Sequence, residues 1–147
     1  MDKRFQGFIN TPVLWENSFE ANLNQLHLSF EDYNSKIDSA FNEKRLGKLV
    51  EQFVFAQLNA HPNIHKVIQN IQIIEDKITL GELDCLFQYL NEYVHLEIVY
   101  KFYLYDELNS PLEIDNWIGP NRIDSFKFKR EKLIHKQLPI LHHPKTL

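Results

Sequence analysis

Three carboxylates and one lysine stand at positions where charged side chains are unexpected. Glu51 lies among apolar neighbours in RLGKLVEQFVF, and Asp84 interrupts the apolar pattern of GELDCLF. Glu97 and Lys101 both lie in YVHLEIVYKFYLY, a stretch that is otherwise typical of a buried strand. An acid inside an apolar strand needs a partner, because burying an unpaired charge is costly. These four residues are therefore the candidates for chemistry.

Carboxylates that converge repel one another unless a cation lies between them or one of them is protonated. Oxygen ligands without cysteine favour magnesium, manganese or calcium. A nearby lysine orients or helps to deprotonate a water molecule and stabilises developing phosphate charge. The combination suits metal-assisted phosphodiester hydrolysis, with Mg²⁺ or Mn²⁺ as the predicted cofactor. The alternative is a solvated Glu51 and an Asp84 that makes a structural bond, with Arg45 or Lys101 as its partner.

The stretch around Glu97 predicts a strand with two faces. Its even positions, 94 to 104, are all apolar or aromatic, whereas its odd positions include His95, Glu97 and Lys101. Since successive side chains of a strand point to opposite faces, one face belongs to the core and the other carries these polar residues. A hairpin with the preceding strand would bring Asp84 near Glu97. The alternative is an ordinary one-sided sheet whose odd face, His95 included, meets solvent.

Two helices and three strands are predicted to position these residues. Apolar residues at helical spacing predict helices over about 36–60, ended by His61-Pro62, and about 122–138. Between the helices, alternating apolar segments predict strands over 64–76, 77–90 and 93–105. Turns near Glu75-Asp76-Lys77 and Leu90-Asn91-Glu92 favour an antiparallel meander. The predicted fold class is therefore α/β, with a three-strand antiparallel meander flanked by helices.

Length and composition fit one globular domain over residues 1–147, with a core of about 36–141 and a poorly defined segment over 1–35. The chain shows neither the pattern of a signal peptide nor an apolar run of the ~20 residues that span a membrane. A single cysteine, Cys85, excludes an intrachain disulfide. We therefore expect a cytoplasmic protein without membrane contact. Residues 122–147 carry seven positive and two negative charges, which suggests a phosphate-facing surface or a solvated helix face.

The order Glu51, Asp84, Glu97 and Lys101 resembles the PD-(D/E)XK nuclease superfamily, whose fold is restriction-endonuclease-like. The segments RLGKLVE, TLGELD, HLEIVYKFYL, WIGPNRID and HKQL further resemble a bacterial family of unknown function assigned to that superfamily. The resemblance covers about 45–141. It implies a restriction-endonuclease-like core with a central mixed sheet, and a longer protein of which this chain is an N-terminal portion.

The resemblance also implies roles for individual residues. Glu51, Asp84 and Glu97 would bind the metal, and Lys101 would serve the attacking water. The superfamily motif places its lysine two residues after the acid, where this chain has Val99, so Lys101 comes two residues late. Further residues expected in the cleft or at the substrate are Glu82, His95, Gln137, Lys127, Lys129 and Arg130.

The sequence therefore predicts a divalent-metal-dependent nuclease domain that acts on DNA or RNA. The displaced Lys101 and the acidic body motivate an alternative, a catalytically inactive nuclease-like fold that binds nucleic acid or protein. The sequence does not choose between DNA and RNA, between endonuclease and exonuclease action, or between oligomeric states.

Overall fold

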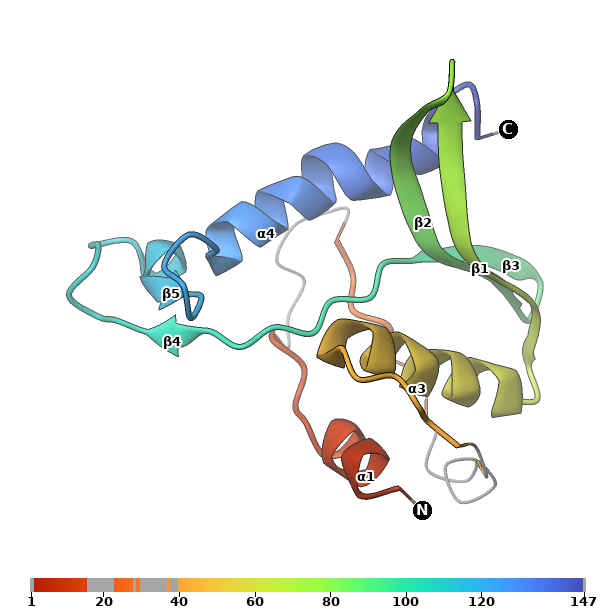
Figure 1. The fold of residues 1–147 in the computed structure, drawn as a ribbon, viewed down its shortest axis with the longest axis horizontal. Coiled ribbons are helices and arrows are strands. Elements are labelled where there is room, and N and C mark those ends of the chain that lie inside the picture. Colours follow the sequence, from red (N-terminus) through yellow and green to blue (C-terminus); the bar gives the residue numbers. More distant parts are fainter. Residues whose placement is uncertain (1, 16–22, 28, 30–36, 38–39, 147) are drawn as a thin grey trace. The chain divides into compact units, whose positions relative to one another are not determined.

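A computed structural model describes residues 2–15, 23–27, 29, 37 and 40–146. The chain divides into two compact units. The first unit comprises Met1–Ile71 and Asp84–Ile98, and the second comprises Gln72–Leu83 and Val99–Leu147. The described elements combine helices with a three-stranded antiparallel sheet, which confirms the predicted α/β class (Figure 1). The assignment to a restriction-endonuclease-like core stays a prediction.

The N-terminal part of the first unit is a cluster of aromatic rings. Helix α1, Lys3–Ile9, begins where the Asp2 side chain accepts a hydrogen bond from the N–H of Arg4. Phe5 on α1 is fully buried, and its ring lies 5.3 Å from that of Phe53 on helix α3, Leu46–Ala60. The ring of Phe41 meets that of Phe53 edge-on at 4.7 Å. These contacts fix α1 against α3.

Helix α3 begins ten residues later than predicted. Glu43 Oε1 accepts hydrogen bonds of 2.8 Å from the N–H groups of Lys44 and Arg45, and Arg45 has an extended backbone. This local turn competes with helix and displaces its start to Leu46. Of the predicted first turns, residues 36, 38 and 39 lie outside the described part. The predicted end before Pro62 is confirmed, because His61 is extended.

The meander consists of β1, Ile64–Glu75, β2, Ile78–Tyr89, and β3, Glu92–Leu96, in that order across the sheet (Figure 1). Two-residue turns join consecutive strands, as predicted. Asp76 and Lys77 both have positive φ, 46° and 66°, which is the geometry of the tight turn that matches strand twist.

Strand β3 is much shorter than the predicted 93–105. It ends at Leu96, residues 97–103 lie outside regular structure, and Leu104–Tyr105 form a separate strand, β4. The physical reason is a side chain: Asp84 Oδ2 accepts a 2.8 Å hydrogen bond from the N–H of Ile98 and so replaces a backbone ladder bond. Glu97 and Lys101 therefore do not share one continuous strand.

The sheet and α3 enclose one hydrophobic cluster of the first unit. Phe55 and Leu58 of α3 pack with Ile64, Cys85 and Phe87 of the sheet. The even positions 94, 96 and 98 pack against this cluster, as predicted, but Phe102 and Leu104 are exposed by 61% and 69%. Cys85 is a fully buried core residue, and burial, aided by the Asp84 charge, raises the pKa of its thiol to about 12.

The second unit is built around a C-terminal helical segment. Helix α4, Phe126–Lys132, continues as a π-helical turn over Leu133–Gln137 and a 3₁₀ turn over Leu138–His142. A short 3₁₀ turn, Glu113–Asn116, leads into β5, Trp117–Ile118, which pairs with β4 (Figure 1). Within the described residues, no helix is long and apolar enough to cross a membrane.

The predicted start of the C-terminal helix at residue 122 is wrong by four residues. Asn121 Oδ1 accepts hydrogen bonds from the N–H groups of Ile123 and Asp124, and Arg122 has a left-handed φ of 59°. The segment is thus held as a turn. Ser125 then caps α4 by accepting a hydrogen bond from the N–H of Phe128.

Candidate functional site

Two of the predicted acids lie where the pairing of β2 with β3 ends. The last pair of that register is Cys85 with Leu96, so Asp84 and Glu97 are the next residues of the two segments. Because side chains alternate along a strand, Asp84 lies on the face of β2 away from Cys85. The predicted hairpin is confirmed, and the proximity of the Asp84 and Glu97 carboxylates stays a prediction.

Each acid of this pair has its own hydrogen-bond donor. The N–H of Ile98 donates to Asp84 Oδ2, and the imidazole Nε2 of His95 donates to Glu97 Oε1, both at 2.8 Å. A hydrogen bond to a well-placed donor restricts the orientation of a carboxylate. Asp84 and Glu97 are thus each oriented by a donor of their own.

His95 and Glu97 form a deeply buried polar pair. Their side chains are only 6% and 3% exposed. The interpretation of the odd face as a solvent face, with an ordinary exposed histidine, is therefore wrong at these two positions. A carboxylate this well buried needs a close donor, and His95 supplies it.

Glu51 comes from α3. It lies three, four and seven residues before Val54, Phe55 and Leu58, so it extends the helix stripe that packs on the hydrophobic cluster. Its side chain is 15% exposed and bonds Lys48 Nζ at 2.6 Å. Lys48 also reaches Asn70 Oδ1 on β1 at 3.4 Å. Glu51, the metal ligand predicted on the helix, is therefore paired with a lysine, Lys48.

The described residues contain no cluster of three or more His, Cys, Asp or Glu side chains arranged to hold a metal ion. Glu51 is thus not gathered with Asp84 and Glu97 into one ligand set. Magnesium, however, keeps several waters and is commonly held by one or two carboxylates together with substrate phosphate. Asp84 and Glu97 offer oxygen donors of the kind that Mg²⁺ or Mn²⁺ prefers, and their joint binding of an ion stays a prediction.

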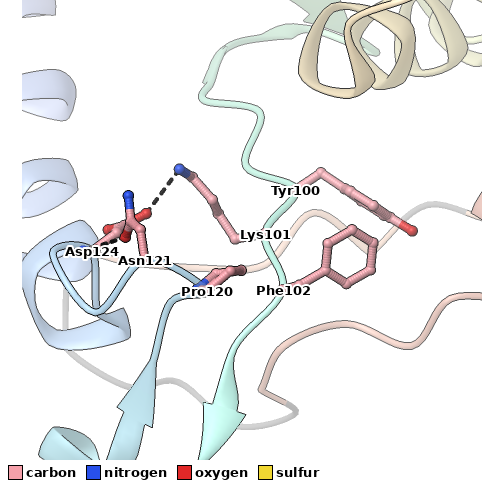
Figure 2. A pocket seen from close by; sticks show the side chains of 6 residues that line it. All are labelled: Tyr100, Lys101, Phe102, Pro120, Asn121 and Asp124. Carbon is pink, nitrogen blue, oxygen red and sulfur yellow. Dashed lines mark hydrogen bonds and ion pairs between the residues drawn. The ribbon is translucent and has the colours of Figure 1, made fainter.

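Lys101 belongs to the second unit, where it lines a hollow of about 280 Å³. Its Nζ lies 2.8 Å from Oδ2 of Asp124, and the two side chains are 46% and 25% exposed. Figure 2 shows Lys101 pointing toward Asp124 and Asn121, whereas Tyr100 and Phe102 point to the other side of the chain. The predicted lysine is therefore an exposed, singly paired cation.

The loop between β5 and α4 holds Asp124 in place. The N–H of Gly119 donates to the carbonyl of Asp124 at 2.8 Å, and a Cβ at position 119 would lie 2.9 Å from that carbonyl oxygen. Glycine is required here because the loop closes on itself so tightly. The segment WIGPNRID thus positions the carboxylate that binds Lys101.

The comparisons with known proteins identify a family. The model of a domain of unknown function, DUF1853, matches residues 5–147. The chain belongs to the DUF1853 family. No curated protein and no solved structure matches the chain. The family description names neither fold nor activity, so membership of the PD-(D/E)XK superfamily stays a prediction.

The basic residues predicted to meet substrate differ in their surroundings in the DUF1853 chain. Lys127 Nζ bonds Asp115 Oδ1 at 2.8 Å, an arrangement that lowers the pKa of Asp115 and raises that of Lys127. Lys129 Nζ bonds Oε1 of Gln137 at 2.6 Å, so Gln137 is engaged on its own helical segment. Arg130 is half-buried on α4. These cations are less available than residue type alone suggests.

One predicted residue, Glu82, and two residues that were not predicted, Asp124 and Lys48, have still to be placed on the DUF1853 chain. Glu82 is half-buried on β2, in the part of that strand that belongs to the second unit. Asp124 and Lys48 bind site residues but were not predicted. The i, i+3 spacing of Lys48 and Glu51 is a signal that could have found the lysine. Asp124 lies 23 residues from its partner, and no local pattern announces such a contact.

Proposed function

We propose that this DUF1853 chain is a divalent-metal-dependent phosphodiesterase domain of the PD-(D/E)XK type that acts on nucleic acid. The observation that supports the proposal is that Asp84 and Glu97 directly follow the last pair of the β2–β3 register, Cys85 with Leu96, at the open end of the hairpin. Two carboxylates on adjacent strands, following a glutamate on a helix, match the order of acids in that superfamily. The hydrogen bonds from Ile98 and His95 support these acids as a prepared pair.

Asp84 and Glu97 would hold Mg²⁺ or Mn²⁺ at this pair, with Glu51 as the further ligand that the resemblance implies. Such an ion, when bound, stabilises phosphate charge and makes water a stronger nucleophile. The protein's own part is to keep both carboxylates oriented before substrate arrives. Ile98 N–H and His95 Nε2 perform this orientation, each from 2.8 Å.

Lys101 is proposed to serve the attacking water or the developing phosphate charge. Its present partner, Asp124, forms an exposed ion pair, and exposed pairs contribute only about 0–1 kcal/mol. An ammonium group held so weakly can exchange its carboxylate for a substrate phosphate at little cost.

Calorimetric titration of Mn²⁺ tests the proposal without knowledge of the substrate. We expect the parent chain to bind Mn²⁺ and both Asp84→Asn and Glu97→Gln to lose binding. Glu92→Gln is the matched control, because Glu92 is an exposed carboxylate on β3. A parent chain that binds no Mn²⁺, or acid variants that bind as well as the parent, would overturn the assignment. Cleavage of labelled DNA and RNA in Mg²⁺ then tests turnover.

A second candidate function is a nuclease-like fold that binds nucleic acid without cleaving it. The observations that favour it are the pairing of Lys101 with Asp124 and the pairing of Lys48 with Glu51. The first ion pair occupies the predicted catalytic lysine, and the second occupies the predicted helix ligand. Within the described residues, Lys132 and Lys136 are exposed lysines of the C-terminal helical segment that remain available to phosphate.

Salt-dependent binding distinguishes this second candidate. Lys132→Ala and Lys136→Ala should each weaken binding to nucleic acid. Each should also reduce the slope of log affinity against log salt concentration by about 1, which corresponds to the loss of one phosphate contact. Lys127→Ala is the control, since Lys127 is already paired with Asp115. Binding with these properties but no turnover in Mg²⁺ or Mn²⁺ would favour the second candidate over the first.

A further inference from the structure

We infer that His95 is a positioning residue that presents Glu97 to the metal, an inference that rests on the proposed function. The bond concerned joins His95 Nε2 to Glu97 Oε1 at 2.8 Å, between side chains that are 6% and 3% exposed. His95 contacts Glu97 and is assigned no direct contact with metal or substrate. Its role is to choose one orientation of the carboxylate.

The spacing of the two residues makes this role possible. Residues two apart on an extended chain share a face, about 7 Å apart along the backbone, so a ring at 95 can reach a carboxylate at 97. Burial then removes competing water from both side chains. A glutamate has three rotatable bonds, and one fixed hydrogen bond in a dry environment removes most of that freedom.

The place of Glu97 in the chain gives the orientation its importance. Glu97 lies just beyond the end of β3, where strand pairing no longer fixes the backbone. The bond to His95 Nε2 therefore helps to hold the carboxylate where the sheet does not. Hydrogen bonds to metal-binding carboxylates typically change metal affinity by about 10- to 100-fold when they are removed.

A purely structural role for the pair would have a different consequence. Buried polar pairs often contribute little to stability, and apolar replacements of similar volume are frequently neutral. If His95 serves packing alone, a large apolar side chain should leave metal affinity unchanged. Stability and metal affinity therefore report separately on the two roles.

The test is Mn²⁺ titration by calorimetry on the parent, His95→Phe, His95→Gln and Asp84→Asn, with thermal unfolding of each metal-free variant. His95→Phe keeps a large ring but removes the donor, and we expect it to bind Mn²⁺ about 10- to 100-fold more weakly. His95→Gln retains an N–H near the position of Nε2 and should recover most of the affinity. His65→Gln, at an exposed histidine of β1, should match the parent.

The outcomes separate this inference from the proposed function. If the parent binds Mn²⁺, Asp84→Asn does not, and folded His95→Phe binds as tightly as the parent, the positioning role is overturned and the carboxylate site stands. If the parent binds no Mn²⁺, the site and the positioning role both fail. If His95→Phe does not fold, His95→Gln decides: affinity near the parent's supports the donor role, and affinity as low as that of Asp84→Asn overturns it.

Discussion

Lys101 Nζ lies 2.8 Å from Asp124 Oδ2, so the lysine of the predicted catalytic motif pairs with a carboxylate 23 residues further along the chain. Both residues line the hollow of the second unit. The tight loop at Gly119 holds the backbone of Asp124. The pair provides the simplest test of what Lys101 does.

Asp124→Asn should leave both folding and cleavage largely intact, whereas Lys101→Met should abolish cleavage. Because the ion pair is exposed, its loss should change the free energy of unfolding by less than about 1 kcal/mol. Urea denaturation and initial cleavage rates in Mg²⁺ measure the two effects. Loss of cleavage in a folded Asp124→Asn would instead assign the carboxylate a direct part in the reaction.

Two substitutions at Asp84 should separate its structural role from its chemical role. Asp84→Ala leaves the N–H of Ile98 without its acceptor and should lower the free energy of unfolding by about 1–3 kcal/mol. Asp84→Asn keeps an acceptor oxygen and should lower the free energy of unfolding much less. Both variants should lose Mn²⁺ binding. Equal stability of the two variants would show that the bond to Ile98 contributes little.

Replacement by alanine should raise the stability of the fold at one glycine and lower it at another. Gly47 is an exposed residue of α3 with open space where an added methyl group would lie, so Gly47→Ala should stabilise the fold by about 0.5–1 kcal/mol. Gly119→Ala should destabilise it by about 1–3 kcal/mol, because the new Cβ would meet the carbonyl oxygen of Asp124 at 2.9 Å. Thermal and urea unfolding of both variants measure the difference, and a neutral Gly119→Ala would contradict the tight loop.

Alkaline pH should weaken the fold through Cys85. The pKa of this thiol is about 12 in the folded chain and 9.0 as a reference for the unfolded chain, so the folded state holds the proton more tightly. Its stabilising contribution is complete below about pH 9 and is lost as pH rises toward about 12. Urea denaturation at about pH 8 and about pH 10.5 should show a smaller decline for Cys85→Val than for the parent. An equal decline would exclude the thiol as a cause.

The hairpins were predictable because their signals are local. Alternating apolar residues fix each strand, and short polar turns at Asp76-Lys77 and Leu90-Asn91 fix the register. The register ends with Cys85 and Leu96, next to the two acids. The fold class and the hairpins therefore followed from periods of two and from turn chemistry, and the acid pair stays a prediction.

The errors arose where a side chain replaces a backbone partner. Asp84 ends β3 by binding Ile98, Glu43 delays α3, and Asn121 holds the loop before α4 as a turn. Alternation and helical period carry no information about such bonds. The burial of His95 with Glu97 was missed for a related reason, since exposure depends on what covers the polar face.

The bond between Asp84 and Ile98 has a consequence for the order of folding. The two residues are 14 apart in the chain, and closing so short a loop costs little entropy. Hairpins of this kind form within about 1–10 microseconds, well before contacts between distant segments. The end of the hairpin that carries Asp84 and Glu97 is accordingly expected to form early, from a stretch that carries its own donors, so that slower steps of folding surround a segment already in place.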